Sequence, residues 1–342
     1  MRAFIVGVAG PVLSEKERAF LREAEPWGLI LFQRNVTTPE LLKRLIGEIR
    51  SVLGREVPVL IDQEGGRVQR LRPPHWPAYP PGAIYGAIYD RDRQQGLAAA
   101  RSAARLIAAD LTALGIDVDC LPIADVPVAG ADPVVGDRAY GNEPGKVAAI
   151  ATAIAQGLSD GGVLPVLKHL PGHGRATADS HARLPVVNTD WATLENTDFA
   201  AFRPLAALPL GMTAHVVFTA VDPIAPATLS RTIVRDVIRD SIGFRGLLMS
   251  DDISMGALEG SIAKRSSAAI AAGCDLVLHC NGDMAEMMSV AAEAPVLTGD
   301  AARRSAAALA AKRAADPIDP IASRNEFLKL VAGAWLPPQA SA

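Results

Sequence analysis

Gly246-Leu247-Leu248-Met249-Ser250-Asp251-Asp252 joins a short apolar run to two carboxylates, and short apolar runs of this kind recur along the whole chain. None of them alternates with polar residues, which is typical of parallel strands that are covered on both faces. The eight candidate strands are residues 4–8, 28–32, 57–61, 118–124, 164–167, 211–214, 247–249 and 276–278.

Longer segments with helical character separate these runs. Start and stop signals bound several of them, such as Thr37-Thr38-Pro39 before one helix and Gly115 or Gly273 after others. The predicted helices are residues 40–53, 95–114, 144–160, 230–241, 254–259 and 264–272. Strands interleaved with helices in this way predict an α/β protein with a single (β/α)8 TIM barrel. A doubly wound open sheet would carry a phosphate loop after the first strand, and Val8-Ala9-Gly10-Pro11 is not one.

The composition bounds the class of protein. With 342 residues, 49% hydrophobic content and a formal net charge of −3, the chain is typical of a globular protein with neither nucleic acid nor a membrane as partner. Cys120, Cys274 and Cys280 form neither a disulfide framework nor a zinc spacing, which favours a reducing, cytoplasmic location. The apolar start at residues 4–10 is followed at once by charges, so we interpret it as a first strand and not as a signal peptide.

The domain prediction is a TIM-barrel catalytic domain over residues 1–316 and a C-terminal tail over residues 317–342. Pro317, Pro320, Pro337 and Pro338 interrupt the tail, so we expect it to be partly helical or disordered, with residues 339–342 disordered.

Polar residues follow six of the predicted strands directly. Because the active site of a TIM barrel lies at the carboxyl ends of its strands, we expect these side chains to converge on one pocket. They are Asp62-Gln63-Glu64 and Arg70, Asp125, Lys168-His169, His215, Ser250-Asp251-Asp252 and His279.

Residues 170–188 form the longest segment without a helical or strand period. A long structureless loop in a compact domain is usually functional. Asp179 and His181 lie two apart in it, and a carboxylate that orients an imidazole supports proton transfer near neutral pH. A structural hydrogen bond of a loop histidine remains the alternative at this point.

Asp251 follows an apolar run and supplies the second acidic group that a covalent mechanism at a sugar carbon requires. The alternative is that one residue of Ser250-Asp251-Asp252 caps a helix. His169 and His173 have the spacing of a helical zinc pair, but Pro171 and Gly172 between them argue against a helix. We therefore expect no catalytic metal.

Several ordered motifs resemble the bacterial β-N-acetylglucosaminidases of glycoside hydrolase family 3. The match runs from about Gly28 to Gly282. Its blocks are Ile61-Asp62-Gln63-Glu64-Gly65-Gly66-Arg67-Val68-Gln69-Arg70, Gly136-Asp137-Arg138, Lys168-His169-Leu170-Pro171-Gly172-His173-Gly174, Asp179-Ser180-His181, Met212-Thr213-Ala214-His215, Pro226-Ala227-Thr228-Leu229-Ser230 and Ser250-Asp251-Asp252-Ile253-Ser254-Met255.

The resemblance implies a retaining mechanism with Asp251 as nucleophile, His181 as acid/base and Asp179 as its partner. This mechanism is expected to need neither a metal nor an organic cofactor. It implies that the terminal sugar is held by Asp62, Arg70, Arg138, Lys168 and His169. Relatives of this length resemble cytoplasmic enzymes that remove N-acetylglucosamine from 1,6-anhydromuramoyl fragments of peptidoglycan, so a saccharide or muropeptide substrate and a monomer are expected. A β-glucosidase, a phosphorylase, a metal-dependent hydrolase and a non-catalytic sugar-binding protein remain alternatives.

Overall fold

The computed structural model describes residues 1–338, and within them eight parallel strands close into one barrel. Each strand pairs in parallel with both neighbours, in the order β1-β12-β11-β9-β7-β6-β3-β2. The strands are β1 (Arg2–Gly7), β2 (Pro26–Leu31), β3 (Val59–Ile61), β6 (Val118–Asp119), β7 (Leu164–Leu170), β9 (Leu210–Thr213), β11 (Leu247–Asp252) and β12 (Leu276–His279). The predicted single α/β barrel is confirmed.

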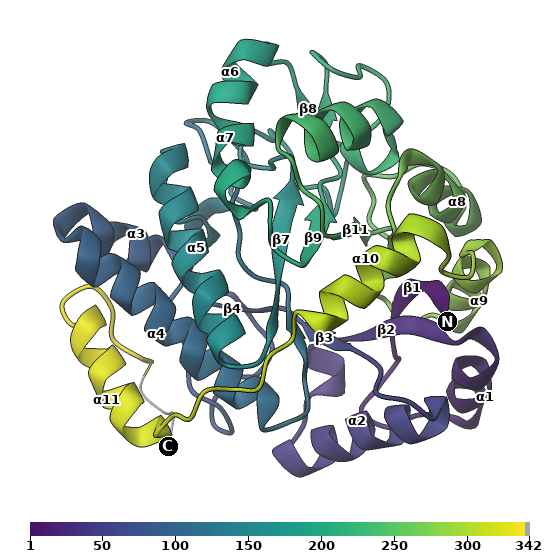
Figure 1. The fold of residues 1–342 in the computed structure, drawn as a ribbon, viewed down its shortest axis with the longest axis horizontal. Coiled ribbons are helices and arrows are strands. Elements are labelled where there is room, and N and C mark those ends of the chain that lie inside the picture. Colours follow the sequence, from purple (N-terminus) through teal and green to yellow (C-terminus); the bar gives the residue numbers. More distant parts are fainter. Residues whose placement is uncertain (339–342) are drawn as a thin grey trace.

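Helices surround the barrel (Figure 1). They are α1 (Glu15–Ala24), α2 (Pro39–Leu53), α3 (Gly82–Arg91), α4 (Arg93–Thr112), α5 (Pro144–Asp160), α6 (Trp191–Asn196), α7 (Asp198–Phe202), the π-helix η5 (Ile233–Ser241), α8 (Ile262–Ala272), α9 (Met284–Glu293), α10 (Gly299–Ala310) and α11 (Pro320–Val331). Short strands β4 (Gln63–Gly65) with β5 (Val68–Gln69), and β8 (Val186–Val187) with β10 (Val217–Phe218), decorate the loops. Within residues 1–338, every helix is too short or too polar to cross a lipid bilayer.

Alternate residues of each strand face opposite sides, and this alternation assigns side chains to two apolar layers. One cluster fills the barrel interior and includes Leu247 and Met249 of β11 and Leu276 and Leu278 of β12. The other cluster, which includes Leu248, lies between the strands and the helices. Continuing the interior series two residues beyond Met249 gives Asp251, so β11 carries this carboxylate into the mouth of the barrel.

Two C-terminal helices complete the molecule (Figure 1). Helix α10 closes the amino-terminal end of the barrel, where Ala308 joins the interior cluster and the Trp27 indole donates a hydrogen bond to Ser305 over 2.7 Å. Helix α11 lies along α4 and buries Phe327 and Val331. This helix falls within the segment that we expected to be a partly helical or disordered tail, whereas residues 339–342 lie outside the described residues.

The predicted helix at residues 254–259 is wrong, because this segment forms consecutive turns. Two of its amide groups bond to a distant loop: Gly256 and Ala257 donate their N–H groups to the carbonyls of His181 and Ser180. The predicted strand at 118–124 is also too long, since β6 ends at Asp119. Beyond it the Leu121 amide turns back to the Asp119 carbonyl, which interrupts the ladder.

Candidate active site

One pocket of about 290 Å³ opens at the carboxyl ends of the barrel strands. All eight residues proposed from the sequence line it, namely Asp62, Arg70, Arg138, Lys168, His169, Asp179, His181 and Asp251. Apolar side chains complete its wall, among them Ile30, Phe32, Met212, Met255 and Leu278. Charged and polar side chains outnumber apolar ones in this wall, and convergent polar groups of this kind fix the orientation of a small ligand.

Asp251 lies at the end of β11, where its Oδ1 atom accepts a hydrogen bond of 2.8 Å from the Asp252 amide. Burial acts to raise the pKa of Asp251, but the imidazoles of His215 and His169, the Asp252 amide and Lys168 together hold that pKa below its ordinary value. The carboxyl group is therefore ionised at neutral pH, as a nucleophile must be.

Asp179 and His181 form the pair that the sequence suggested. One carboxylate oxygen, Oδ1 of Asp179, accepts the backbone N–H of His181 at 2.9 Å and lies 2.7 Å from its Nδ1 atom. Burial acts to raise the pKa of Asp179, but its contacts with His181 lower it. With Nδ1 turned toward the carboxylate, Nε2 is the ring nitrogen left to exchange a proton with a ligand.

The first half of the loop that carries this pair is packed into the protein. The Gly174 carbonyl accepts from the Val128 amide, and a Cβ atom at Gly174 would lie 2.1 Å from the Val126 carbonyl oxygen. The His181 side chain, by contrast, is 68% exposed. From this loop, His173, Asp179, Ser180 and His181 line the pocket, and of these four His181 is the exposed residue.

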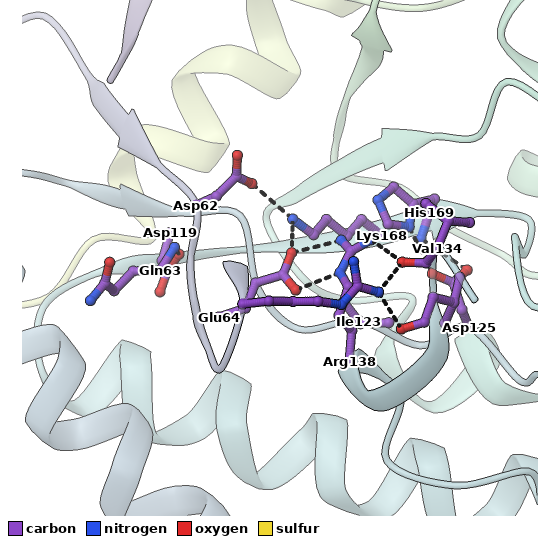
Figure 2. A network of polar contacts seen from close by, with 12 residues as sticks. Asp62, Gln63, Glu64, Asp119, Ile123, Asp125, Val134, Arg138, Lys168 and His169 are labelled. Atoms are coloured by element: carbon purple, nitrogen blue, oxygen red, sulfur yellow. Dashed lines mark hydrogen bonds and ion pairs between the residues drawn. The ribbon is translucent and has the colours of Figure 1, made fainter. Parts of the chain in front are cut away.

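A buried lysine lies between two carboxylates in the pocket floor (Figure 2). The Lys168 ammonium is 2.9 Å from Asp62 and 2.7 Å from Glu64. Burial favours neutral lysine, but the two carboxylates more than offset this and raise the pKa of Lys168. Burial likewise acts to raise the pKa of Asp62, and Lys168 and Arg70 more than reverse it. All of these groups therefore stay charged.

Two arginines extend this network. Arg138 binds both oxygens of Glu64 in a bidentate pair at 2.8 Å, and Arg70 contacts Asp62 at 3.0 Å. The Arg70 guanidinium also lies 5.3 Å from the centre of the Phe32 ring. Arg70, Arg138 and Lys168 are thus ion-paired with carboxylates, and all three side chains also line the pocket wall.

A buried carboxylate orients His169. Asp125 accepts at 2.7 Å from Nδ1 of His169 and at 2.6 Å from the backbone N–H of His173. His173 also contacts Ser180 through Nε2 at 3.0 Å, and burial lowers its pKa to about 4, so its ring is neutral. The possible zinc pair His169 and His173 is thus taken up by other partners, and no group of three candidate metal ligands occurs in residues 1–338.

The expectation that all six strand ends would present a titratable group to the pocket is wrong for three residues. His279 faces the outer layer and contacts Glu286 of α9, because it alternates with the interior-facing Leu278. His215 is buried behind Asp251 and donates through Nε2 to the Asp252 carbonyl. Asp125 lies behind His169.

Sequence analysis expected Glu64 in the pocket but did not include it among the catalytic or sugar-binding residues, and it assigned no role to Ser180 or to the buried Asp119. Glu64 belongs to a quoted motif, and its place beside Asp62 was the available signal. Asp119 accepts the Gln63 amide at 3.0 Å, and burial raises the pKa of its carboxyl group well above the ordinary value. Nothing in its surrounding sequence indicates this contact with β4, because the two segments meet only in the barrel.

A barrel with an ionised carboxylate, a carboxylate-braced histidine and buried cations in one pocket has the features of a glycoside hydrolase. The chain belongs to glycosyl hydrolase family 3, since residues 6–309 match the family description "Glycosyl hydrolase family 3 N terminal domain". The resemblance found from the motifs is therefore confirmed, and the protein is a glycoside hydrolase.

Individual relatives cover nearly the whole chain. A β-hexosaminidase of Aromatoleum aromaticum is 37% identical over 317 residues, which are 92% of this chain and 88% of the relative. A β-hexosaminidase of Alkalilimnicola ehrlichii is 40% identical over 81% of this chain and 80% of its own length. The crystal structure of NagZ from Neisseria gonorrhoeae in complex with N-trifluoroacetyl-D-glucosamine is similar with a TM-score of 0.84, at 31% identity and over 97% and 98% of the two chains.

Proposed function

We propose that this protein is a retaining exo-β-N-acetylglucosaminidase that releases terminal, non-reducing β-linked N-acetylglucosamine through a covalent intermediate on Asp251. The observation that carries the proposal is the presence of Asp251 and the Asp179–His181 pair in the wall of one pocket. The β-hexosaminidase relatives and the glucosamine derivative bound by the Neisseria protein support an N-acetylated sugar as the ligand.

In the first step, Asp251 attacks the anomeric carbon and the bond to the leaving oxygen breaks. His181, protonated at Nε2, donates this proton to the leaving oxygen while Asp179 stabilises the imidazole through Nδ1. The products are the free aglycone and a glycosyl ester of Asp251.

In the second step, neutral His181 takes a proton from water, and that water attacks the anomeric carbon. The ester bond breaks and Asp251 leaves as a carboxylate, which its hydrogen bond from the Asp252 amide stabilises. Two inversions give net retention of the anomeric configuration. Most retaining glycosidases use a carboxylic acid as acid/base, and the histidine is the departure from that pattern here.

The remaining pocket residues have the chemistry for sugar recognition. Asp62 can accept from sugar hydroxyls, whereas Lys168, Arg70 and Arg138 can donate to hydroxyl or acetamido oxygens. A volume of about 290 Å³ lies at the small end of ligand pockets, which supports recognition of one terminal sugar.

We further propose that the natural substrates are peptidoglycan fragments in which N-acetylglucosamine is linked to a 1,6-anhydromuramoyl residue, with or without peptide, and that the enzyme acts in the cytoplasm as a monomer. The resemblance of the motifs to family members of this length supports this substrate class, and the glucosamine derivative bound by the Neisseria protein supports its N-acetylglucosamine part.

Trapping the intermediate tests the mechanism. A 2-acetamido 5-fluoro glycoside should label the protein, and mass spectrometry of peptides should place the label on Asp251. Attachment to Asp252 or Glu64 instead would overturn the assignment of the nucleophile.

Product analysis tests the reaction and the substrate. We expect free N-acetylglucosamine with and without inorganic phosphate, and faster release from an anhydromuramoyl disaccharide than from chitobiose. Sugar 1-phosphate as the main product would make the protein a phosphorylase, and faster turnover of a glucoside would contradict the sugar assignment.

A further inference from the structure

We propose that the segment of residues 253–260, directly after the nucleophile strand, clamps the loop that carries His181, and that Gly256 is the positioning residue of this clamp. The inference rests on the proposed role of His181 as acid/base. It concerns a residue that does not itself touch the sugar.

The clamp consists of two backbone hydrogen bonds between loops far apart in sequence. The Gly256 amide donates to the His181 carbonyl at 3.0 Å, and the Ala257 amide donates to the Ser180 carbonyl at 3.1 Å. Because the His181 side chain is 68% exposed, its imidazole is placed by these backbone contacts and by the Asp179 carboxylate and not by side-chain packing.

The 253–260 segment is itself held firmly. Arg265 of α8 donates to the carbonyls of Ile253 at 2.8 Å, Met255 at 3.2 Å and Gly260 at 3.1 Å. Asp252 accepts both the amide and the hydroxyl of Ser254. The 253–260 segment thus follows Asp251 directly and is held by several hydrogen bonds. One short stretch of chain therefore positions the nucleophile and restrains the loop that carries the acid/base.

Only a residue without a side chain fits at position 256. A Cβ atom there would lie 2.8 Å from the His181 carbonyl oxygen and 2.9 Å from that of Ala182. Both contacts are with backbone atoms, which cannot rotate away as a flexible side chain could. A methyl group would therefore push the loop outward and shift the His181 Nε2 atom relative to Asp251.

A second contact holds the same loop from within. Nε2 of the neutral His173 lies 3.0 Å from the Ser180 hydroxyl. This contact limits how far the loop moves when the clamp weakens. Substitution at Gly256 should thus misplace the acid/base without unfolding the loop, and it should leave the sugar-binding residues in place.

The test compares Gly256→Ala, His181→Ala and the control Gly10→Ala, whose Cβ atom would meet nothing within 4 Å. The measurement is kcat/KM for phenyl and 2,4-dinitrophenyl β-N-acetylglucosaminides, because only the poor phenolate leaving group needs a proton. For Gly256→Ala we expect a loss of about 10- to 100-fold on the phenyl substrate and less than about 3-fold on the dinitrophenyl substrate. Azide should accelerate turnover of the dinitrophenyl substrate by Gly256→Ala. The control Gly10→Ala should have the kcat/KM of the parent on both substrates.

The outcomes separate the inference from the function on which it rests. If His181→Ala shows no dependence on the leaving group, the proposed acid/base fails. If His181→Ala does depend on the leaving group, the clamp is refuted when Gly256→Ala loses kcat/KM equally on both substrates or on neither of them. If Gly256→Ala does not fold, Arg265→Lys tests the clamp instead. This variant loses the guanidinium contacts to the 253–260 segment, so its kcat/KM should also fall more on the phenyl than on the dinitrophenyl substrate, by a smaller factor.

Discussion

At the scale of single residues, two adjacent aspartates illustrate how environment separates roles. Asp252 has both carboxylate oxygens occupied, by the Ser254 amide and hydroxyl and by the Cys280 amide. Asp251 accepts one hydrogen bond, from the Asp252 amide, and lines the pocket. The sequence alone left open which of them caps the following turn, and the structure gives this role to Asp252.

Removing the charge of Asp251 tests its role directly. Asp251→Asn keeps the size of the side chain but is a far weaker nucleophile, so we expect kcat to fall by about 10³-fold or more. Steady-state assays measure the loss, and circular dichroism checks that the fold is kept. A variant that retains a tenth of the parent rate would contradict a covalent mechanism at this residue.

His173 should make the protein less stable at acidic pH. Its folded-state pKa of about 4 lies below the ordinary value near 6.5, so its contribution to stability is complete above pH 6.5 and is lost progressively as the pH falls toward 4. Between pH 7.5 and pH 5 this loss is about 2 kcal/mol. Urea unfolding at both pH values measures this loss in the free energy of unfolding, and the loss should be smaller in His173→Gln than in the parent. The exposed His75→Gln is the control, and an unchanged loss in His173→Gln would refute the prediction.

At the scale of elements, the period of two along the strands brings three of the predicted residues to the pocket, whereas His169 lines it although it follows Leu167 of the outer layer. Asp62, Lys168 and Asp251 each follow an interior-facing residue by two positions, namely Leu60, Val166 and Met249. His279 follows Val277 of the outer layer and is directed away. A polar residue that directly follows a strand therefore does not always reach the pocket. The alternation of inward- and outward-facing side chains along β12 would have excluded His279.

Asp125 joins elements that are distant in sequence, because it holds both His169 at the end of β7 and the amide of His173 in the following loop. Asp125→Asn replaces one accepting oxygen by a donor, which conflicts with a protonated Nδ1 of His169. We expect kcat/KM to fall by about 10²-fold with little change in secondary structure. Retention of full activity would show that the orientation of His169 does not depend on this carboxylate.

At the scale of the whole molecule, α11 is attached to the barrel by specific contacts. The Phe327 ring is buried near Tyr79, the Gln95 side chain donates to the Leu330 carbonyl at 2.7 Å, and Arg324 lies over the Tyr79 ring. Tyr79 in turn accepts the Gly66 amide through its carbonyl, which connects the helix with the hairpin that follows Asp62. We propose that α11 unfolds together with the barrel.

Truncation of Phe327 measures this attachment. Phe327→Ala should lower the free energy of unfolding by about 3 to 5 kcal/mol, as for other buried aromatic residues, with a single unfolding transition. Ile321→Ala on the same helix is the control, because Ile321 is 77% exposed and its removal should cost little. A separate early transition, or a loss below about 1 kcal/mol, would show that α11 is an independent appendage.

The amino-acid sequence by itself determined the barrel and eight of the residues that line the pocket. The barrel and the strand-end residues follow from local features, namely short apolar runs, glycine and proline punctuation, and polar residues after strands. Arg138 was found only through the resemblance to the family. The motifs then predicted the family, because ordered blocks such as residues 61–70 and 168–174 are specific. Local features also misled where backbone bonds are satisfied by distant partners, as at residues 254–259.

Only the tertiary structure decided which charges neutralise one another and how the loops are held. Lys168 and Glu64 lie 104 positions apart in sequence, yet their contact of 2.7 Å keeps both charged in a buried place. The junction between Gly256 and His181 likewise joins two loops whose meeting depends on closure of the barrel. The physical reason is that hydrogen bonds and ion pairs act over a few ångströms of space, whereas a sequence pattern reports only on neighbours along the chain.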